Sequence, residues 1–198
     1  MIVAGVFVGG KARRMGGVPK GLIPHPTEPW TVVEHVVREA RAVGAEPLLV
    51  GEASAYALLG LPSVEDAMAE VGPAGGMLAL FRHAQGGIAL ALSCDLPYVR
   101  AKLLEELIEG VRGGAAAMVP RRGDKLEPLC AAYRADAMRV HVETCLGQGI
   151  RSLHRMARAV GAVEIDLEGD RARWLDDWDT PEDVGPAVPE KWKRDRDR

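Results

Sequence analysis

The sequence has little cysteine, few aromatic residues and no long apolar run. Among its 198 residues are three cysteines, and aromatic residues make up 5%. An odd number of cysteines without C-x-x-C spacing predicts neither a disulfide framework nor a structural zinc site. We therefore expect a protein of a reducing compartment, the cytoplasm. Cys94 lies within an apolar run and is predicted to be a buried apolar residue rather than a nucleophile.

Several classes of function lack their sequence signatures. The apolar run at residues 2–8 is too short to cross a membrane and has no basic flank before it, so we expect neither a membrane span nor a signal peptide. Lys and Arg number 25 against 28 Asp and Glu, a net charge of −3, and this balance argues against a nucleic-acid partner. The histidines never pair at metal-ligand spacing, and no G-x-S-x-G or H-E-x-x-H motif is present.

The composition and the pattern of apolar residues predict an α/β fold. Apolar residues make up 47% and charged residues 27% of the chain, as in ordinary globular proteins. We expect one domain over residues 1–184 and a frayed, charged tail over 185–198. Alternating strands and helices predict a mostly parallel sheet with helices on both faces. The expected strands are 2–8, 47–50, 62–65, 88–94, 115–119, 129–134, 163–167 and 172–175, and the expected helices are 31–43, 53–59, 73–84, 100–110, 135–146 and 150–160.

A glycine-rich, basic segment follows the first expected strand. Residues 9–21 hold five glycines and four cationic residues. Glycines let backbone N–H groups approach an anion closely, and Lys and Arg neutralise phosphate charge. The segment matches neither the Walker A motif nor G-x-G-x-x-G. We interpret it as a cradle for a polyphosphate, and a basic surface loop is the alternative.

Two acidic positions are candidate metal ligands. Asp95 follows the apolar run 88–94, so it is expected at the carboxyl end of a buried strand, where ligands bind in open α/β sheets. A carboxylate facing a phosphate site is a natural ligand for Mg²⁺, although it could also be a turn or cap residue. Thr180 before Pro181 predicts a helix start, and Asp179, just upstream, could reach the same metal.

Five motifs in this order resemble the MobA-type molybdenum cofactor guanylyltransferase family. The first, Val6 to Leu22, looks like the family's signature loop, roughly L-A-G-G-x-S-x-R-M-G-x-D-K. The later ones resemble the family's E-D…G-P-L-A-G, C-D-M-P, P-L-x-A-L-Y and N-x-N-T-P-E-D segments, and they are found here at residues 64–76, 93–98, 127–134 and 177–183. The resemblance spans most of residues 3–184, and its first motif is specific.

This resemblance implies a Rossmann-like, three-layer nucleotidyltransferase fold with a mostly parallel, mixed sheet. It also implies transfer of GMP from GTP to molybdopterin, with release of pyrophosphate. It implies Mg²⁺ as cofactor, GTP and molybdopterin as substrates, and other molybdenum cofactor biosynthesis proteins and acceptor molybdoenzymes as partners. Arg14, Lys20 and Asp95 are the implied catalytic residues, and Asp95 with Asp179 the implied metal ligands. The implied nucleotide-binding residues are Phe7, Val8, Gly9, Gly10, Lys20, Gly51, Asp66, Gly76 and Asp95.

The sequence departs from the family pattern at several places and leaves alternatives open. Val8 replaces an alanine, Pro19 an aspartate, and Gly51 an asparagine that the family often has; Asp177 and Asp179 also replace asparagines. A molybdopterin cytidylyltransferase, another small-acceptor nucleotidyltransferase and a non-catalytic nucleotide-binding relative are the other hypotheses. For the phosphate of molybdopterin the candidates are four cations, which could equally be solvated surface residues: Arg121, Arg122, Lys125 and Arg151.

Overall fold

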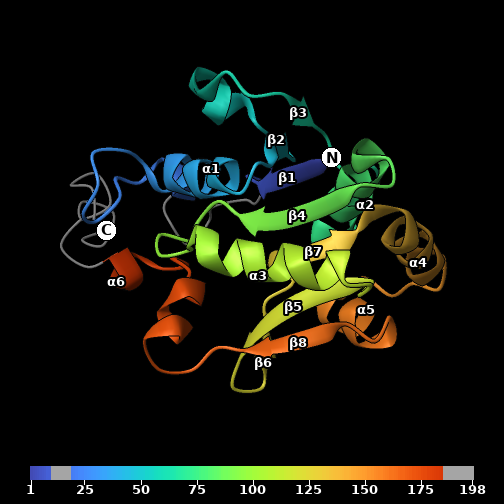
Figure 1. Cartoon of the computed structure of the whole chain (residues 1–198). Coiled ribbons are helices and arrows are strands. Elements are labelled where there is room, and N and C mark those ends of the chain that lie inside the picture. Colours follow the sequence, from blue (N-terminus) through green and yellow to red (C-terminus); the bar gives the residue numbers. More distant parts are fainter. Residues whose placement is uncertain (10–18, 185–198) are drawn as a thin grey trace.

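The computed structural model describes residues 1–9 and 19–184, which form an eight-stranded sheet with helices on both faces (Figure 1). The tail predicted at 185–198 lies outside the described residues. The strands are β1 (Ile2–Phe7), β2 (Glu46–Val50), β3 (Ser63–Val64), β4 (Ile88–Ser93), β5 (Ala117–Arg122), β6 (Lys125–Leu126), β7 (Cys130–Arg134) and β8 (Val163–Asp166). The helices are α1 (Val32–Ala42), α2 (Pro73–Ala84), α3 (Ala101–Arg112), α4 (Ala135–Gly147), α5 (Leu153–Ala159) and α6 (Pro181–Val184), with 3₁₀ turns η2 (Lys20–Leu22), η3 (Ser54–Leu59) and η4 (Gly169–Leu175).

The sheet is mixed, as predicted. Its order is β3-β2-β1-β4-β7-β5-β6, and β8 pairs with β5. The first four strands in this order run parallel, and β7 runs antiparallel to both of its neighbours. The carboxyl ends of β1, β2 and β4 therefore lie at one edge of the sheet, which is where α/β folds bind ligands.

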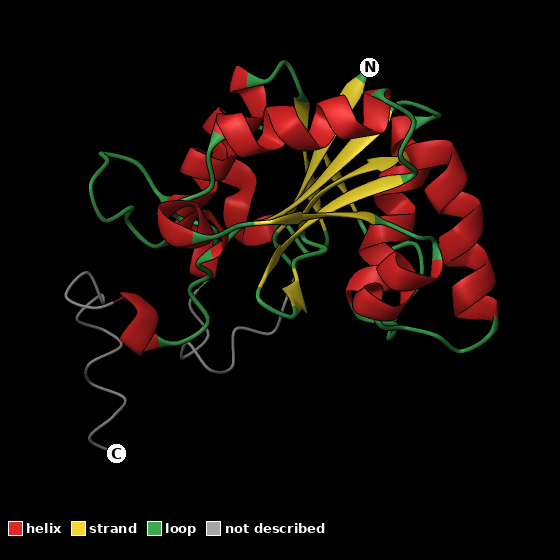
Figure 2. Ribbon diagram, turned by 60° about the horizontal axis from the view of Figure 1, so that its bottom comes forward, coloured by secondary structure: helices red, strands yellow, loops and turns green. Residues whose placement is uncertain are grey.

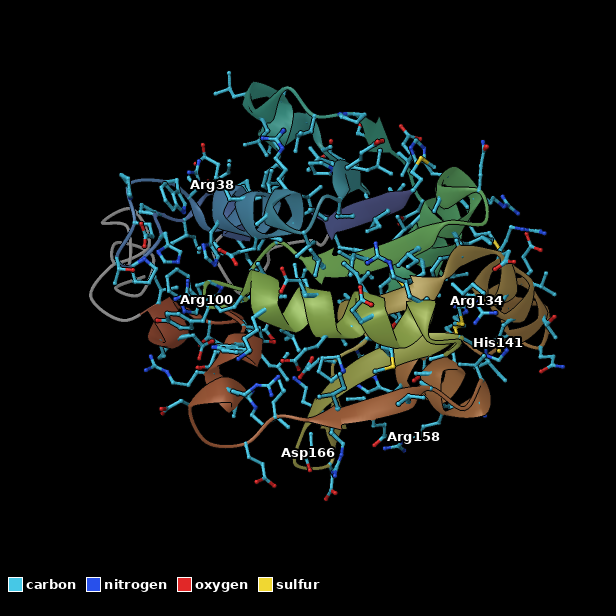
Figure 3. All side chains as sticks on the ribbon, viewed as in Figure 1. Arg38, Arg100, Arg134, His141, Arg158 and Asp166 are labelled. Atoms are coloured by element: carbon cyan, nitrogen blue, oxygen red, sulfur yellow. The ribbon has the colours of Figure 1, made fainter. Side chains whose placement is uncertain are left out.

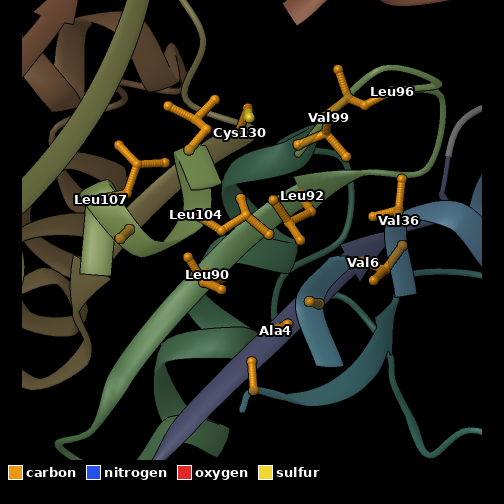
Figure 4. Packing of buried hydrophobic residues seen from close by; sticks show 14 of the residues in the cluster. Ala4, Val6, Val36, Leu90, Leu92, Leu96, Val99, Leu104, Leu107 and Cys130 are labelled. Carbon is orange, nitrogen blue, oxygen red and sulfur yellow. The ribbon is translucent and has the colours of Figure 1, made fainter. Parts of the chain in front are cut away.

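Alternating side chains of the central strands supply two apolar layers. Ala4 and Val6 of β1, with Leu90 and Leu92 of β4, pack with α1 and α3 on one face (Figure 4). Their sequence neighbours point the other way, where α2, α4 and α5 cover the sheet (Figure 2). Because both faces are buried, the central strands are continuously apolar rather than alternating.

The structure confirms the predicted helix at 73–84 and the capping box that starts α1. Thr31 and Glu34 form the reciprocal hydrogen bonds of that box. The strand predicted at 172–175 is wrong, because this segment belongs to the 3₁₀ turn η4. Its apolar residues face the core next to α3 rather than pairing with a strand. The short strand β6 was not predicted; it forms a hairpin with β5 around Gly123, whose φ is +58°.

In the part of the chain that the structure describes, the helices are all too short or too polar to cross a membrane. The three cysteines are buried and free.

Candidate functional site at the carboxyl edge of the sheet

Asp95 lies two residues after the end of β4, in a turn, and is the centre of the site. The residue is 8% exposed, and its carboxylate accepts hydrogen bonds from Ser93 Oγ and Lys20 Nζ. Its backbone carbonyl accepts a hydrogen bond of 3.1 Å from the amide of Trp178. Burial raises the pKa of Asp95, while the Ser93 and Lys20 contacts oppose that rise. The Asp95 carboxylate therefore has two hydrogen-bond donors, one from its neighbour Ser93 and one from Lys20, which is distant in sequence.

Lys20 joins Asp95 to the C-terminal segment. Its Nζ lies 3.3 Å from Asp95 Oδ2 and is also paired with Asp179 Oδ1. Burial opposes the charge of the ammonium, but the hydrogen bond to Asp179 and the charge of Asp95 outweigh it and raise the pKa of Lys20. Residues 20, 95 and 179 are far apart in sequence, and the fold brings them together as predicted for a shared site.

The turn η2 holds Lys20 beside the turn that follows β4 and contains Cys94 and Asp95. The amide of Gly21 donates a hydrogen bond of 3.3 Å to the hydroxyl of Tyr56, which lies on η3. That hydroxyl lies 3.8 Å from Cys94 Sγ. Burial raises the pKa of Cys94 to about 12, so its thiol is a packing group near neutral pH, as predicted.

The predicted nucleotide residues of β1, β2 and α2 meet at the same edge. A Cβ on Gly51, whose φ is +97°, would lie 3.0 Å from the Cα of Gly9, so these two backbones approach closely. A Cβ on Gly76 would lie 2.8 Å from the Phe7 ring and 3.0 Å from Asp66 Oδ1. Partial burial raises the pKa of Asp66. These residues therefore pack closely at this edge, and neither Gly51 nor Gly76 leaves room for a side chain.

Val8 is buried, and its backbone amide is already engaged. It donates a hydrogen bond of 3.0 Å to the carbonyl of Val50, and the carbonyl of Phe7 accepts one of 3.2 Å from the amide of Cys94. The Val8 amide and the Phe7 carbonyl therefore both join β1 to its neighbouring segments. Gly10 and Arg14, also predicted for this site, lie outside the described residues.

We predict that Gly76→Ala destabilises the protein by about 1–2 kcal/mol, because the new methyl group overpacks the space against Phe7 and Val50. The better helix propensity of alanine offsets only part of this cost. Gly147→Ala is the matched control, since a Cβ there, also in a helix, meets nothing within 4 Å. Urea unfolding of both variants measures the difference. Equal urea midpoints for the two variants would show that a methyl group at position 76 is accommodated without overpacking.

A cleft of about 470 Å³ adjoins Asp95 on the side away from β1. It lies between β4, the segment around β6 and β7, and the start of α5. Its lining residues are Pro73, Ser93, Asp95, Leu96, Lys125, Glu127, Pro128, Leu129, Cys130, Arg151, Ser152, Leu153, His154, Asp177 and Asp179. The cleft therefore reaches from the Asp95 site to two cations, Lys125 and Arg151.

The four cations proposed from the sequence separate into two pairs. Lys125 and Arg151 line the cleft. Arg121 instead pairs with Glu164 and Asp166, which lie on β8. Arg122 pairs with Asp176. Of these four cations, only Lys125 and Arg151 are placed to contact a ligand that binds beside Asp95.

Sequence reasoning missed Ser93, Tyr56 and His154 as site residues. Ser93 could have been found, since side chains two positions apart on an extended segment share a face and Asp95 is two residues on. Tyr56 and His154 come from distant elements and reach the site only through the tertiary fold.

The acidic groups present fit a hard cation only in part. In residues 1–9 and 19–184 there is no group of three or more His, Cys, Asp or Glu able to hold a metal ion. Two carboxylates, of Asp95 and Asp179, do converge on one cationic centre, the Lys20 ammonium. Mg²⁺ in phosphate sites is commonly held by one or two carboxylates together with substrate phosphates. The donor set therefore fits a magnesium ion that arrives with a nucleotide.

Comparison with known proteins gives a consistent family. The MobA-like NTP transferase domain matches residues 4–163. The molybdenum cofactor guanylyltransferase of Pseudomonas putida is 33% identical over 184 residues, which cover 89% of this chain and 92% of that protein. The probable molybdenum cofactor guanylyltransferase of Carboxydothermus hydrogenoformans is 32% identical over 133 residues, 67% of this chain and 66% of that protein.

A solved structure has a similar overall fold. The molybdopterin-guanine dinucleotide biosynthesis protein A of Archaeoglobus fulgidus superposes with a TM-score of 0.75 at 25% identity and covers 98% of this chain. All of that protein is covered. The domain match over most of the chain and the similarity to these relatives show that this chain belongs to the MobA-like NTP transferase family and is a nucleotidyltransferase.

Proposed function

We propose that the protein transfers GMP from GTP to molybdopterin, forming molybdopterin guanine dinucleotide and pyrophosphate. The observation that carries the proposal is the convergence of Lys20, Asp95 and Asp179 at the carboxyl edge of the sheet, beside a cleft of about 470 Å³. The nucleotide would bind along the glycines at the ends of β1 and β2 and at the start of α2, molybdopterin would bind in the cleft, and the reacting phosphates would meet at Lys20 and Asp95. The names of the Pseudomonas and Archaeoglobus relatives supply guanine and molybdopterin as the two ligands.

The reaction is an in-line displacement. An oxygen of the terminal phosphate of molybdopterin forms a bond to the α-phosphorus of GTP, and the bond from that phosphorus to the bridging oxygen of pyrophosphate breaks. A phosphate monoester is largely ionised near neutral pH, so no protein base has to remove a proton. The work of the protein is positioning and charge stabilisation.

Lys20 supplies the positive charge from the protein. Its ammonium is held by two carboxylates in the structure, and we propose that it exchanges one of them for phosphate oxygens when the triphosphate binds. Asp179 is the partner it would release, because that side chain is 51% exposed and Asp95 is buried. A lysine ammonium in this role stabilises charge that builds on the leaving pyrophosphate.

Asp95 and Asp179 would hold the magnesium ion, which supplies further neutralisation of phosphate charge. Ser93 orients one oxygen of Asp95 by a hydrogen bond, so the carboxylate presents its other oxygen toward Lys20 and the ligand. Molybdopterin would enter the cleft beside Asp95. Lys125 and Arg151 are the cations there that its phosphate would meet, although Lys125 is paired with Glu127 at 2.8 Å in the free protein.

We also propose the cytoplasm as the site of this reaction, since three free thiols persist in a reducing compartment. The partners implied by the product are enzymes of molybdenum cofactor synthesis and the molybdoenzymes that accept it.

The test is a panel of nucleotides. Purified protein is incubated with molybdopterin, magnesium and either GTP, CTP or ATP, and pyrophosphate release is measured alongside the mass of the product. The proposal predicts release with GTP at least about tenfold faster than with CTP, a difference of about 1.4 kcal/mol. Faster release with CTP would instead identify the protein as a molybdopterin cytidylyltransferase. No release with any of the three would contradict transfer to molybdopterin.

A further inference from the structure

Two buried histidines contact the segment that follows Asp95 but have no role in the reaction proposed above. His25 follows η2, and His35 lies on α1; they are 6% and 2% exposed. Their rings are 4.7 Å apart between centroids and tilted by 39°. Buried imidazoles need hydrogen-bond partners, and both partners here are backbone groups of the segment that follows Asp95.

His25 ties the Lys20 turn to the Asp95 segment. Its Nε2 lies 2.7 Å from the carbonyl oxygen of Pro97, and its Nδ1 accepts a hydrogen bond of 3.3 Å from the amide of Thr27. A carbonyl only accepts and an amide N–H only donates, so the two contacts fix a neutral ring with its proton on Nε2. This hydrogen bond joins residues that lie five positions after Lys20 and two positions after Asp95.

His35 makes the same kind of contact two residues further along. Its Nε2 donates a hydrogen bond of 2.9 Å to the carbonyl of Val99. Burial lowers the pKa of His35 and the charge of Arg100 lowers it further, while the Val99 contact and the charge of Glu39 oppose this. The ring is therefore neutral near neutral pH, and it can lie against His25 without charge repulsion.

The segment from 95 to 101 is held at every second residue. The carbonyl of Asp95 is bonded by Trp178, that of Pro97 by His25 and that of Val99 by His35, and the amide of Ala101 donates to Glu39 of α1. The intervening Leu96 is buried in the same apolar cluster as Val99 and Val36 (Figure 4). Three of these four contacts come from the stretch between Lys20 and the end of α1.

We propose that His25 and His35 are positioning residues for phosphate transfer: their Nε2–H groups fix the 95–101 segment against the Lys20 turn and so hold Asp95 opposite Lys20. Misplacement of reacting groups by about 1 Å can cost about 100-fold in rate, so removal of either donor reduces turnover although neither ring touches substrate. The kinetic part of this proposal rests on the proposed transfer reaction.

A histidine far from the site provides a control for the loss of one histidine hydrogen bond. His141 on α4 also makes an Nε2 hydrogen bond of 2.9 Å to a backbone carbonyl, that of Met156. Figure 3 shows His141 at the opposite end of the molecule from Arg100, which precedes α3. His141→Leu removes an equivalent hydrogen bond far from the site, so it reports the general cost of losing one.

The experiment compares His25→Leu, His25→Gln and His141→Leu well below their melting temperatures. We expect His25→Leu to lower kcat for pyrophosphate release at least about tenfold, and His25→Gln, which retains a donor, to stay within about threefold of the wild type. His141→Leu should leave kcat unchanged. An equal fall in both leucine variants, or no fall in His25→Leu, would overturn the positioning role.

A second readout does not need turnover. Long-range ¹H–¹⁵N NMR of the wild type should show both rings neutral with the proton on Nε2, and the carboxyl ¹³C resonance of Asp95 should shift in His25→Leu but not in His141→Leu. If the wild type releases no pyrophosphate with any nucleotide, the transfer reaction fails and this readout decides the positioning role. An unmoved Asp95 resonance in His25→Leu would then overturn it.

Discussion

Asp95→Asn lowers the rate of pyrophosphate release by about 1,000-fold, as expected when the carboxylate that would hold magnesium at the reacting phosphates is lost. Asparagine has the same shape, so the packing against Ser93 is retained. It lacks the negative charge that pairs with Lys20 at 3.3 Å and that would hold magnesium. The measurement is the steady-state rate with saturating magnesium, nucleotide and molybdopterin.

The fold should survive this change. Burial raises the pKa of Asp95 above its value in the unfolded chain, so the ionised carboxylate reduces stability as the pH rises through that pKa. A neutral asparagine avoids this cost near neutral pH, and we expect a melting temperature at least as high as that of the wild type. Asp124→Asn, in the exposed β5–β6 turn, is the control and should keep the full rate. A rate above one third of the wild type in Asp95→Asn would remove Asp95 from the chemistry.

Lys20→Ala should weaken binding of the magnesium–triphosphate complex by about 10–100-fold, which corresponds to the loss of a charged hydrogen bond. It also leaves the carboxylates of Asp95 and Asp179 facing each other without the ammonium that joins them. Titration calorimetry measures the affinity. Lys20→Arg keeps the charge, so its affinity should fall between those of Lys20→Ala and the wild type.

The control for this variant is Lys102→Ala, an exposed lysine on α3. It removes the same charge from the protein and should bind the nucleotide like the wild type. If both alanine variants lose affinity equally, the effect is one of net charge. If Lys20→Ala binds as tightly as the wild type, Lys20 has no contact with the phosphates.

The sequence predicts the elements that have strong local signals. The apolar runs of β1 and β4 and the Thr31 capping box each depend on neighbouring residues, and each was predicted to within about two residues. Asp95 was predicted as a site residue for the same reason, because it directly follows a strand that is apolar throughout. Asp95 lies in the turn after β4, as its alternative interpretation predicted, and its contact with Lys20, 75 positions away in sequence, could not be predicted from neighbouring residues.

The parts that sequence alone could not give depend on distant contacts. The segment 172–175 has strand-like composition, but it forms part of a 3₁₀ turn whose Leu175 and Trp174 pack into the apolar core. Arg122 and Arg151 look alike in sequence. One is neutralised by Asp176 and the other lines the cleft, and only the tertiary structure separates them.

The fate of the nucleotide phosphates tests the central claim most directly. GTP carrying a radioactive α-phosphate, and GTP carrying a radioactive γ-phosphate, are each incubated with the protein, magnesium and molybdopterin. The account predicts that the α label appears in the molybdopterin product and the γ label in pyrophosphate, in equal amounts. Appearance of the γ label on molybdopterin, or as inorganic phosphate, would mean that the bond to the γ-phosphorus is cleaved, and would contradict nucleotidyl transfer at Lys20 and Asp95.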